Sequence, residues 1–252
     1  MKKKIFKIIK TLYKNKVNLG HASSLRNPKM ADFILLKTKN FDIINPFKIL
    51  KYKIRAQKFL EKCSSLGGSI LFVGTKKQIK EIIKKYANKV NMPYINYKWP
   101  AGLLTNITNT RSTIQKKEDL KNQNKNLYKY LSKKEKVLIE RKYKKINKKF
   151  GTIFKMKKLP MAIIIVDIKK EKIAFKEALK TFIYTIGIVD TDSDPDNIDY
   201  PIPANDDLSK SIEYILKGLT KYIKRGILYR KKRIKNYEEK NNKKDSKVTK
   251  IN

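Results

Sequence analysis

The chain carries, at residues 67–75, the sequence Gly67-Gly68-Ser69-Ile70-Leu71-Phe72-Val73-Gly74-Thr75. Its apolar centre has the length of a buried strand, and glycines flank it on both sides. The segment that follows, 76–89, places its isoleucines and Tyr86 on one stripe at helical spacing, with lysines elsewhere. A strand, a short glycine turn and a helix form half of a βαβ unit. This stretch therefore predicts an α/β domain with a parallel sheet that helices cover on both faces.

The same pattern recurs later in the chain. A β-branched run at Ala162–Asp167 precedes a predicted helix at Lys172–Lys180, and a third strand is predicted at Thr185–Asp190. Two more covering helices are predicted. They are Ile49–Leu66, with Ile54, Phe59 and Leu60 facing inward, and Asp207–Lys224, with Asn205 or Asp206 as its cap. These segments place the α/β domain in residues 17–106 and 159–228.

Residues 107–158 interrupt this domain with almost no strand signal. Apolar residues there follow a heptad spacing of 4, 3, 4 and 3: Ile139, Tyr143, Ile146, Phe150 and Ile153. A facing arm is predicted from Ile114, Leu120, Leu127 and Leu131. The segment therefore predicts an inserted coiled-coil helical hairpin with its tip near Asn122–Asn126 or Ser132. The alternative is that these helices pack onto the main body.

Both ends of the chain are basic. Residues 1–16 predict an amphipathic helix that packs on its own domain, on a neighbour or on a membrane surface. Lysines break its apolar stretch, so we expect neither a signal peptide nor a transit sequence. Residues 229–252 are polar and low in complexity, which predicts a basic tail that is disordered unless an anionic partner orders it.

The charge of the whole chain indicates its partner class. Sixty-two basic residues against 22 acidic ones give a net charge of +40, which favours a polyanion such as nucleic acid. Only seven of the 62 are arginine, a bias typical of AT-rich codons, so a solvated basic surface is the alternative. The single cysteine, Cys63, excludes an internal disulfide.

Two segments suggest an enzyme, and neither has a complete motif. Gly74-Thr75-Lys76 follows a strand as a phosphate loop would, but it lacks the other glycines of the known phosphate-binding fingerprints. Asp190 to Asp196 holds four aspartates, yet Pro195 stands where a calcium loop needs glycine. The alternative function is thus a small phosphate-ligand or nucleotide-binding enzyme. The favoured interpretation has no catalytic residues, no metal site and no cofactor.

Two other residues are unique in their type. His21 is the only histidine and lies in a polar loop, residues 20–30, that also contains Arg26 and Lys29. Trp99 is the only tryptophan and follows Lys98. Two interpretations of Trp99 remain open: a core aromatic residue, or a ring that stacks on a base or ribose.

An ordered series of short motifs runs from Val17 to about Lys224. It comprises Gly20-His21, Arg26-Asn27-Pro28-Lys29-Met30, Leu71–Lys76, Met92-Pro93-Tyr94, Lys98-Trp99, Leu104-Thr105-Asn106, Leu131-Ser132-Lys133-Lys134-Glu135, Ile188-Val189-Asp190-Thr191 and Tyr200-Pro201-Ile202-Pro203. This series resembles the small-subunit ribosomal protein S2 family of bacteria and organelles.

This resemblance implies a flavodoxin-like three-layer α/β/α domain with a protruding coiled coil. It also implies a structural role in the small ribosomal subunit, without enzymatic activity. The implied partners are small-subunit ribosomal RNA and neighbouring ribosomal proteins, with no membrane and no small-molecule substrate.

Contacts to RNA are expected from His21, Arg26, Asn27, Lys29, Lys98, Trp99, Thr105, Asn106 and Arg111. We further expect Arg26→Ala to weaken incorporation into subunits while the free protein still folds. The codon bias and the missing transit sequence predict an organellar ribosome, in a mitochondrion rather than a plastid. The cytoplasm of an AT-rich bacterial endosymbiont is the alternative.

Overall fold

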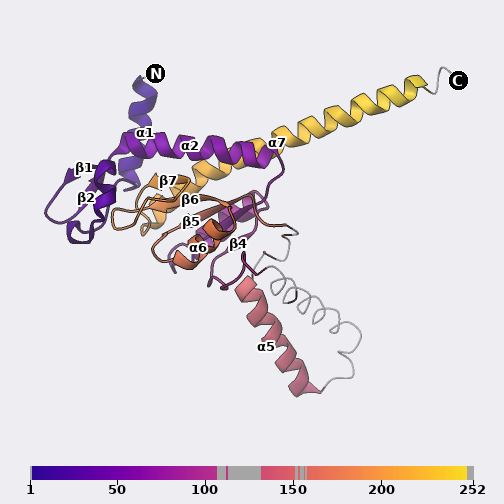
Figure 1. Cartoon of the computed structure of the whole chain (residues 1–252), viewed down its shortest axis with the longest axis horizontal. Coiled ribbons are helices and arrows are strands. Elements are labelled where there is room, and N and C mark those ends of the chain that lie inside the picture. The colour runs from indigo at the N-terminus through magenta and orange to yellow at the C-terminus, as the bar shows by residue number, and fades with distance from the viewer. Residues whose placement is uncertain are drawn as a thin grey trace.

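The computed structural model describes residues 2–106, 112, 132–150, 153, 156 and 158–248, and a five-stranded sheet lies at its centre (Figure 1). The strands are β3 (Ile70–Val73), β4 (Tyr94–Ile95), β5 (Ala162–Val166), β6 (Tyr184–Val189) and β7 (Tyr200–Pro203). They pair in the order β4-β3-β5-β6-β7, and every pair is parallel. This is the strand order of flavodoxin-like doubly wound folds, which confirms the predicted fold class.

Successive side chains of the central strands β3 and β5 enter opposite cores. On β3, Ile70 and Phe72 pack into the core on one face, while Leu71 and Val73 pack into the core on the other. All four are fully buried. A strand buried on both faces cannot alternate apolar with polar residues, which explains why the sequence shows uninterrupted apolar runs.

Helices lie on both faces of the sheet. Those that contribute to the first core are α1 (Lys2–Lys14), α2 (Pro46–Ser65), α3 (Lys80–Lys89) and α7 (Ser209–Val248). The second core is covered by α6 (Lys172–Lys180) together with the segment around Trp99 and Leu104. In Figure 1, α2 and α7 lie side by side above the sheet and α6 lies below it.

Local signals set where the helices begin. At α2, the Asn45 side chain accepts a hydrogen bond from the Phe47 N–H at 3.0 Å, and Pro46 occupies the first turn. Before α7, the Asn205 side chain accepts from the N–H groups of Asp207 and Leu208, so Asn205 holds this turn and Asp206 does not.

The predicted inward face of α2 is wrong at one position. Ile54 is 46% exposed, whereas Lys53 is 7% exposed. The cause lies on α7, where Gly218 has no side chain and the Lys53 chain fills the space. A Cβ atom at Gly218 would lie 2.6 Å from Lys53 Cε.

The N-terminal segment joins the body and adds a second, small sheet. Leu12 of α1 is fully buried, so the helix packs on its own domain, while Phe6 nearer the terminus is 71% exposed. Strands β1 (Ile34–Lys37) and β2 (Asp42–Ile44) form an antiparallel pair that the sequence analysis did not predict.

Helix α5 (Lys133–Phe150) extends away from the α/β body (Figure 1). It begins with a capping box, in which the Glu135 carboxylate accepts from the Ser132 N–H at 2.9 Å and the Ser132 hydroxyl accepts from the Glu135 N–H at 3.3 Å. This helix is the predicted second arm of the hairpin. Ile153, the last residue of the predicted seam, is buried in the second core of the body. The first arm, with Ile114, Leu120, Leu127 and Leu131, lies outside the described residues.

Helix α7 is longer than predicted. The sequence predicts its end at Lys224 and a disordered tail from residue 229, but the helix continues through Val248 and beyond the body (Figure 1). No glycine or proline follows Gly226, and Lys, Arg and Glu all favour helix. Lys235 and Glu239 form an i, i+4 ion pair at 3.8 Å. Neither α7 nor any other described helix has the length and apolarity needed to cross a bilayer.

Candidate functional site

The carboxyl edge of the sheet is where doubly wound folds bind ligands, at the point between β3 and β5 where the strand order reverses. Here this edge is occupied by the chain itself. The loop 20–30 crosses it and is anchored on Thr191, which follows β6. The Thr191 carbonyl accepts from the Asn27 N–H at 2.8 Å, and the Thr191 hydroxyl accepts from the His21 N–H at 2.9 Å.

Lys76, which follows β3, lies at the centre of a carboxylate cluster. Its Nζ is 2.7 Å from Asp167, 3.0 Å from Asp206 and 2.6 Å from Asp207. Burial alone would lower the pKa of Lys76, but Asp167 and Asp207 raise it above its ordinary value. Burial raises the pKa of Asp206 to about 7, and the neighbouring charges of Asp167 and Asp190 act in the same direction. A phosphate group at this turn would therefore meet several carboxylates around one cation that is already paired.

The polar groups of Thr75 also have a partner within the chain. Its N–H donates to the buried Glu171 carboxylate at 3.0 Å, and its hydroxyl donates to the same oxygen. The N–H and hydroxyl of Thr75 and the ammonium of Lys76, which a phosphate loop would offer to its ligand, are thus used within the chain. The Gly74-Thr75-Lys76 turn also lacks the sequence motif of a phosphate site.

His21 lies between aspartates from two loops. Its Nδ1 is 3.1 Å from Asp190 and its Nε2 is 3.0 Å from Asp207. The interaction with Asp190 raises the pKa of His21 to about 9, because it outweighs the opposing effect of burial. Donor atoms of His21, Asp190 and Asp206 lie within 4.8 Å of one another, so these three residues could hold a divalent cation. No metal site is predicted from the sequence, where Pro195 breaks the calcium-loop pattern and His21 is far from both aspartates along the chain.

Arg26 forms a two-pronged ion pair with Asp42. Arg26 Nε and Nη2 donate to the two carboxylate oxygens, both at 2.7 Å, and the Ser23 hydroxyl donates to the same carboxylate at 3.0 Å. Asp42 is fully buried. The pair fixes the loop 20–30 on β2 and changes the expectation for Arg26→Ala, which leaves a buried carboxylate without its cation.

Lys29 and Asn27 are also used within the chain. Lys29 Nζ lies 2.7 Å from both Asp194 and Asp196, which follow β6, and the Asn27 side chain accepts from the Lys29 N–H at 3.0 Å. The Asp194 side chain in turn accepts from the Asp196 N–H at 2.9 Å. Asp194 therefore holds the turn through a backbone hydrogen bond, and both aspartates neutralise part of the charge of Lys29.

The segment 98–106 carries the remaining described candidates. Trp99 is 7% exposed and its Nε1 donates to Glu177 at 3.0 Å, so of the two interpretations the structure shows the core aromatic residue. Lys98, Thr105 and Asn106 are exposed. Arg111 lies outside the described residues.

Glu177 of α6 is the residue that sequence reasoning missed. Its buried carboxylate accepts from the Trp99 ring and from the N–H groups of Gly102 and Leu104, at 3.0, 2.7 and 3.0 Å. Gly102 has a φ of +83°, which favours glycine. One acidic side chain therefore holds the loop that presents Lys98 and Thr105. Its only signal in the sequence is an acidic residue on the inward stripe of a predicted helix.

Comparisons of the sequence with known proteins show the family of the chain. The family model described as ribosomal protein S2 matches residues 12–226. The small ribosomal subunit protein uS2 of Karelsulcia muelleri is 49% identical over 207 residues, which are 82% of this chain and 93% of that protein. The uS2 proteins of Flavobacterium johnsoniae and Helicobacter acinonychis are 41% and 40% identical, over 87% and 86% of this chain and 87% and 89% of their own lengths. Because the family model matches residues 12–226 and these relatives are 40–49% identical over most of the chain, the chain belongs to the ribosomal protein S2 family.

Proposed function

We propose that the chain is a structural constituent of the small ribosomal subunit, where it binds ribosomal RNA and neighbouring ribosomal proteins. The observation that carries this proposal is the family match from residue 12 to residue 226. The net charge of +40 supports it, because a polyanion partner neutralises the repulsion among so many cations.

The chemistry of the carboxyl edge argues against the enzyme alternative. In α/β enzymes this edge is open to a ligand, whereas here Lys76 and His21 are paired with aspartates of the same chain. The site is built to hold the loop 20–30 on the sheet. Its role is to shape the surface around that loop.

Direct contacts to RNA fall into two groups by their state in the free chain. Lys98, Thr105 and Asn106 are exposed on a loop that Glu177 holds in place, and Arg111 follows it in sequence. Lys98 and Thr105 can meet phosphate and ribose groups with little rearrangement, because Glu177 holds their loop. Contacts from Asn106 and Arg111 belong to the same proposal.

The second group consists of His21, Arg26, Asn27 and Lys29, which hold one another and nearby aspartates. We propose that they order the loop 20–30. A phosphate contact from His21, Arg26 or Lys29 would require it to exchange or share its carboxylate partner. Trp99 contributes through the position of its loop, because its ring is buried.

The organisms of the relatives support a choice between the kinds of ribosome. All three are bacterial proteins, and the family match is compatible with an AT-rich bacterial source. The mitochondrial origin expected from codon bias receives no support from these relatives. We propose a bacterial small subunit, and the genomic context of the coding sequence would test this choice directly.

Sedimentation of a cell lysate before and after ribonuclease treatment tests the proposed function. We expect the chain to migrate with small subunits and to lose that position when RNA is digested. A position near the top of the gradient that nuclease does not change would contradict the proposal. It would direct attention back to a small-molecule ligand.

A further inference from the structure

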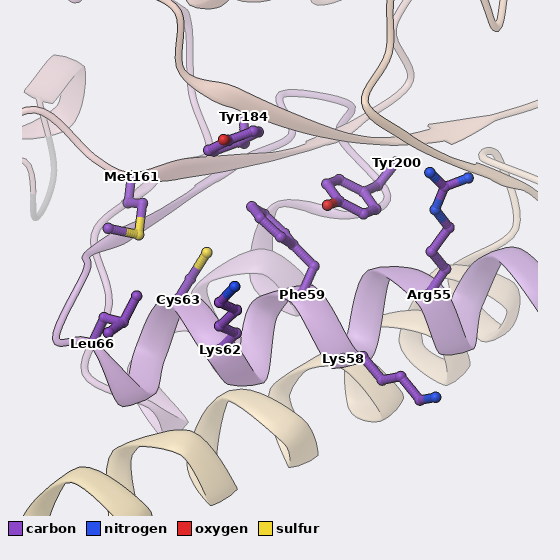
Figure 2. A pocket seen from close by; sticks show the side chains of 9 residues that line it. All are labelled: Arg55, Lys58, Phe59, Lys62, Cys63, Leu66, Met161, Tyr184 and Tyr200. Carbon is purple, nitrogen blue, oxygen red and sulfur yellow. The ribbon is translucent and has the colours of Figure 1, made fainter.

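A basic groove lies at the amino edge of the sheet, opposite the candidate site. Its cavity measures about 630 Å³, within the range of ligand pockets. One wall is a face of α2, whose lining residues Arg55, Phe59, Lys62 and Leu66 recur at helical spacing. The other wall consists of Met161, Tyr184 and Tyr200, at or just before the first residues of β5, β6 and β7 (Figure 2).

Three aromatic rings form the floor of this groove. Phe59 stacks on Tyr200 with ring centroids 4.2 Å apart, and it meets Tyr184 edge to face at 4.9 Å. Tyr184 itself is 48% exposed, and Figure 2 shows its ring on the groove side of the strands. The open aromatic surface of the floor is therefore the Tyr184 ring. Phe59 contacts this ring, and Tyr200 stacks on Phe59.

Cations border the aromatic floor. Arg55 lies over Tyr200, with its guanidinium carbon 5.7 Å from the ring centroid, and Lys62 projects from α2 beside Phe59 (Figure 2). Lys58 lines the rim but points away from the rings. None of the nine lining residues is acidic, and no carboxylate in the described part of the chain forms an ion pair with Arg55, Lys58 or Lys62. The nearby Glu61 is paired with Arg225 at 3.3 Å.

An occupant of this groove must combine negative charge with a flat apolar surface. An unpaired nucleotide has both, since its base can stack on an aromatic ring while its phosphates face cations. We propose that the groove between α2 and the amino ends of β5–β7 binds an unstacked nucleotide of single-stranded RNA. Tyr184 supplies the stacking surface, and Arg55 and Lys62 supply the phosphate contacts. The inference rests on the proposed function, because it names one RNA contact of a ribosomal protein.

Binding of a fluorescein-labelled adenosine hexanucleotide to the full chain tests the groove in isolation. Tyr184→Leu keeps an apolar contact with Phe59 but removes the ring, and we expect affinity to fall by roughly 5- to 100-fold. Tyr184→Phe should restore the affinity. The double variant Arg55→Gln with Lys62→Gln should reduce the slope of log affinity against log salt by about 0.7 for each phosphate interaction that the substitutions remove.

A matched control is available on the opposite face of the sheet. Lys172 and Lys176 of α6 are exposed, and their double replacement by glutamine removes the same charge far from the groove. We expect that control to lose less affinity than the groove variant. Equal losses in the two double variants, or an unchanged affinity in Tyr184→Leu, would overturn the proposal.

Crosslinking within assembled small subunits separates this inference from the proposed function. Ultraviolet irradiation should join a nucleotide to the peptide that contains Tyr184. A carbodiimide crosslink from Lys62 to an acidic segment of a neighbouring protein, without a nucleotide adduct, would overturn the proposal and assign the groove to protein. If the chain does not sediment with small subunits at all, the proposed function itself fails.

Discussion

The two edges of the sheet differ in whether carboxylates of the chain pair with their cations. At the carboxyl edge, Lys76 and His21 contact aspartates of the same chain, and the loop 20–30 covers the strand ends. At the amino edge, Arg55 and Lys62 have no carboxylate partner in the described residues and border an open aromatic groove. The difference shows that net charge alone does not tell which cations are available to an external partner. In our proposal, RNA binds at the cations that no carboxylate of the described residues pairs with.

Arg26 should show the largest effect, because its partner is fully buried. Arg26→Ala leaves the Asp42 carboxylate without its cation, one of the costliest kinds of single substitution. We expect its urea unfolding midpoint to fall more than that of any other variant named here. Arg55→Ala, at the amino edge, is the control and should unfold near the wild-type midpoint. Equal midpoints for the two variants would contradict the claim that cations stabilise the fold at the carboxyl edge and not at the amino edge. Adding Asp42→Asn to Arg26→Ala should recover part of the loss.

Lys53 is a buried cation that forms no ion pair with a carboxylate of the described residues, the reverse of Lys76. Burial lowers the pKa of Lys53 from 10.5 to about 8, while its Nζ lies 3.7 Å from the Tyr214 ring centroid. Between those two pH values the unfolded chain binds more protons than the folded one, so this residue's contribution to stability rises with pH there. Below pH 8 the full cost of the buried ammonium, about 3 kcal/mol, is present.

Urea unfolding of the wild type and of Lys53→Met measures this cost. At neutral pH the variant should be more stable, and its advantage should shrink toward pH 10 as wild-type Lys53 loses its proton. Lys51→Met, an exposed neighbour on α2, controls for the added apolar side chain. An advantage that does not change with pH would show that packing, and not charge, sets the difference.

Glu177→Gln should destabilise the loop 99–104 by about 1–3 kcal/mol, since a buried carboxylate that accepts three hydrogen bonds is replaced by a group with one acceptor oxygen. Hydrogen exchange at the amides of Gly102 and Leu104 measures the loss, and both should exchange faster. Glu239→Gln, on the exposed end of α7, should leave them unchanged. If these two amides keep their protection, Glu177 does not hold the loop.

The smallest effect on stability is expected at the amino edge. The double variant Arg55→Gln with Lys62→Gln removes two exposed cations that pair with no carboxylate in the described part of the chain. The free energy of unfolding should therefore stay within about 0.5 kcal/mol of the wild type. Chemical denaturation checks this value. A larger loss would mean that these cations stabilise the fold, which would weaken their assignment to an external partner.

Much of the architecture could be predicted from local patterns. The apolar runs at residues 70–73 and 162–166 identify buried parallel strands, because a strand covered on both faces needs no polar alternation. The short strands β4 and β7 were not predicted from sequence patterns. β4 has only two residues, and β7 carries two prolines at the edge of the sheet.

The candidate site was predictable only in part. The residues of the loop 20–30 could be named from the sequence, but their partners could not, because Asp42, Asp190 and Asp194 come from distant segments. The same limit applies to Trp99. Its burial depends on Glu177, which reaches the ring from another helix.

The central buried strands, their flanking helices, the net charge and the family could be read from the sequence, since these depend on neighbouring residues and on short motifs. Which cations are paired became clear only from the folded structure. That distinction depends on where distant carboxylates meet them, as Asp42 meets Arg26 and as no described carboxylate meets Lys62. Pairing is a property of distances in space, and one residue's position along the chain does not encode it.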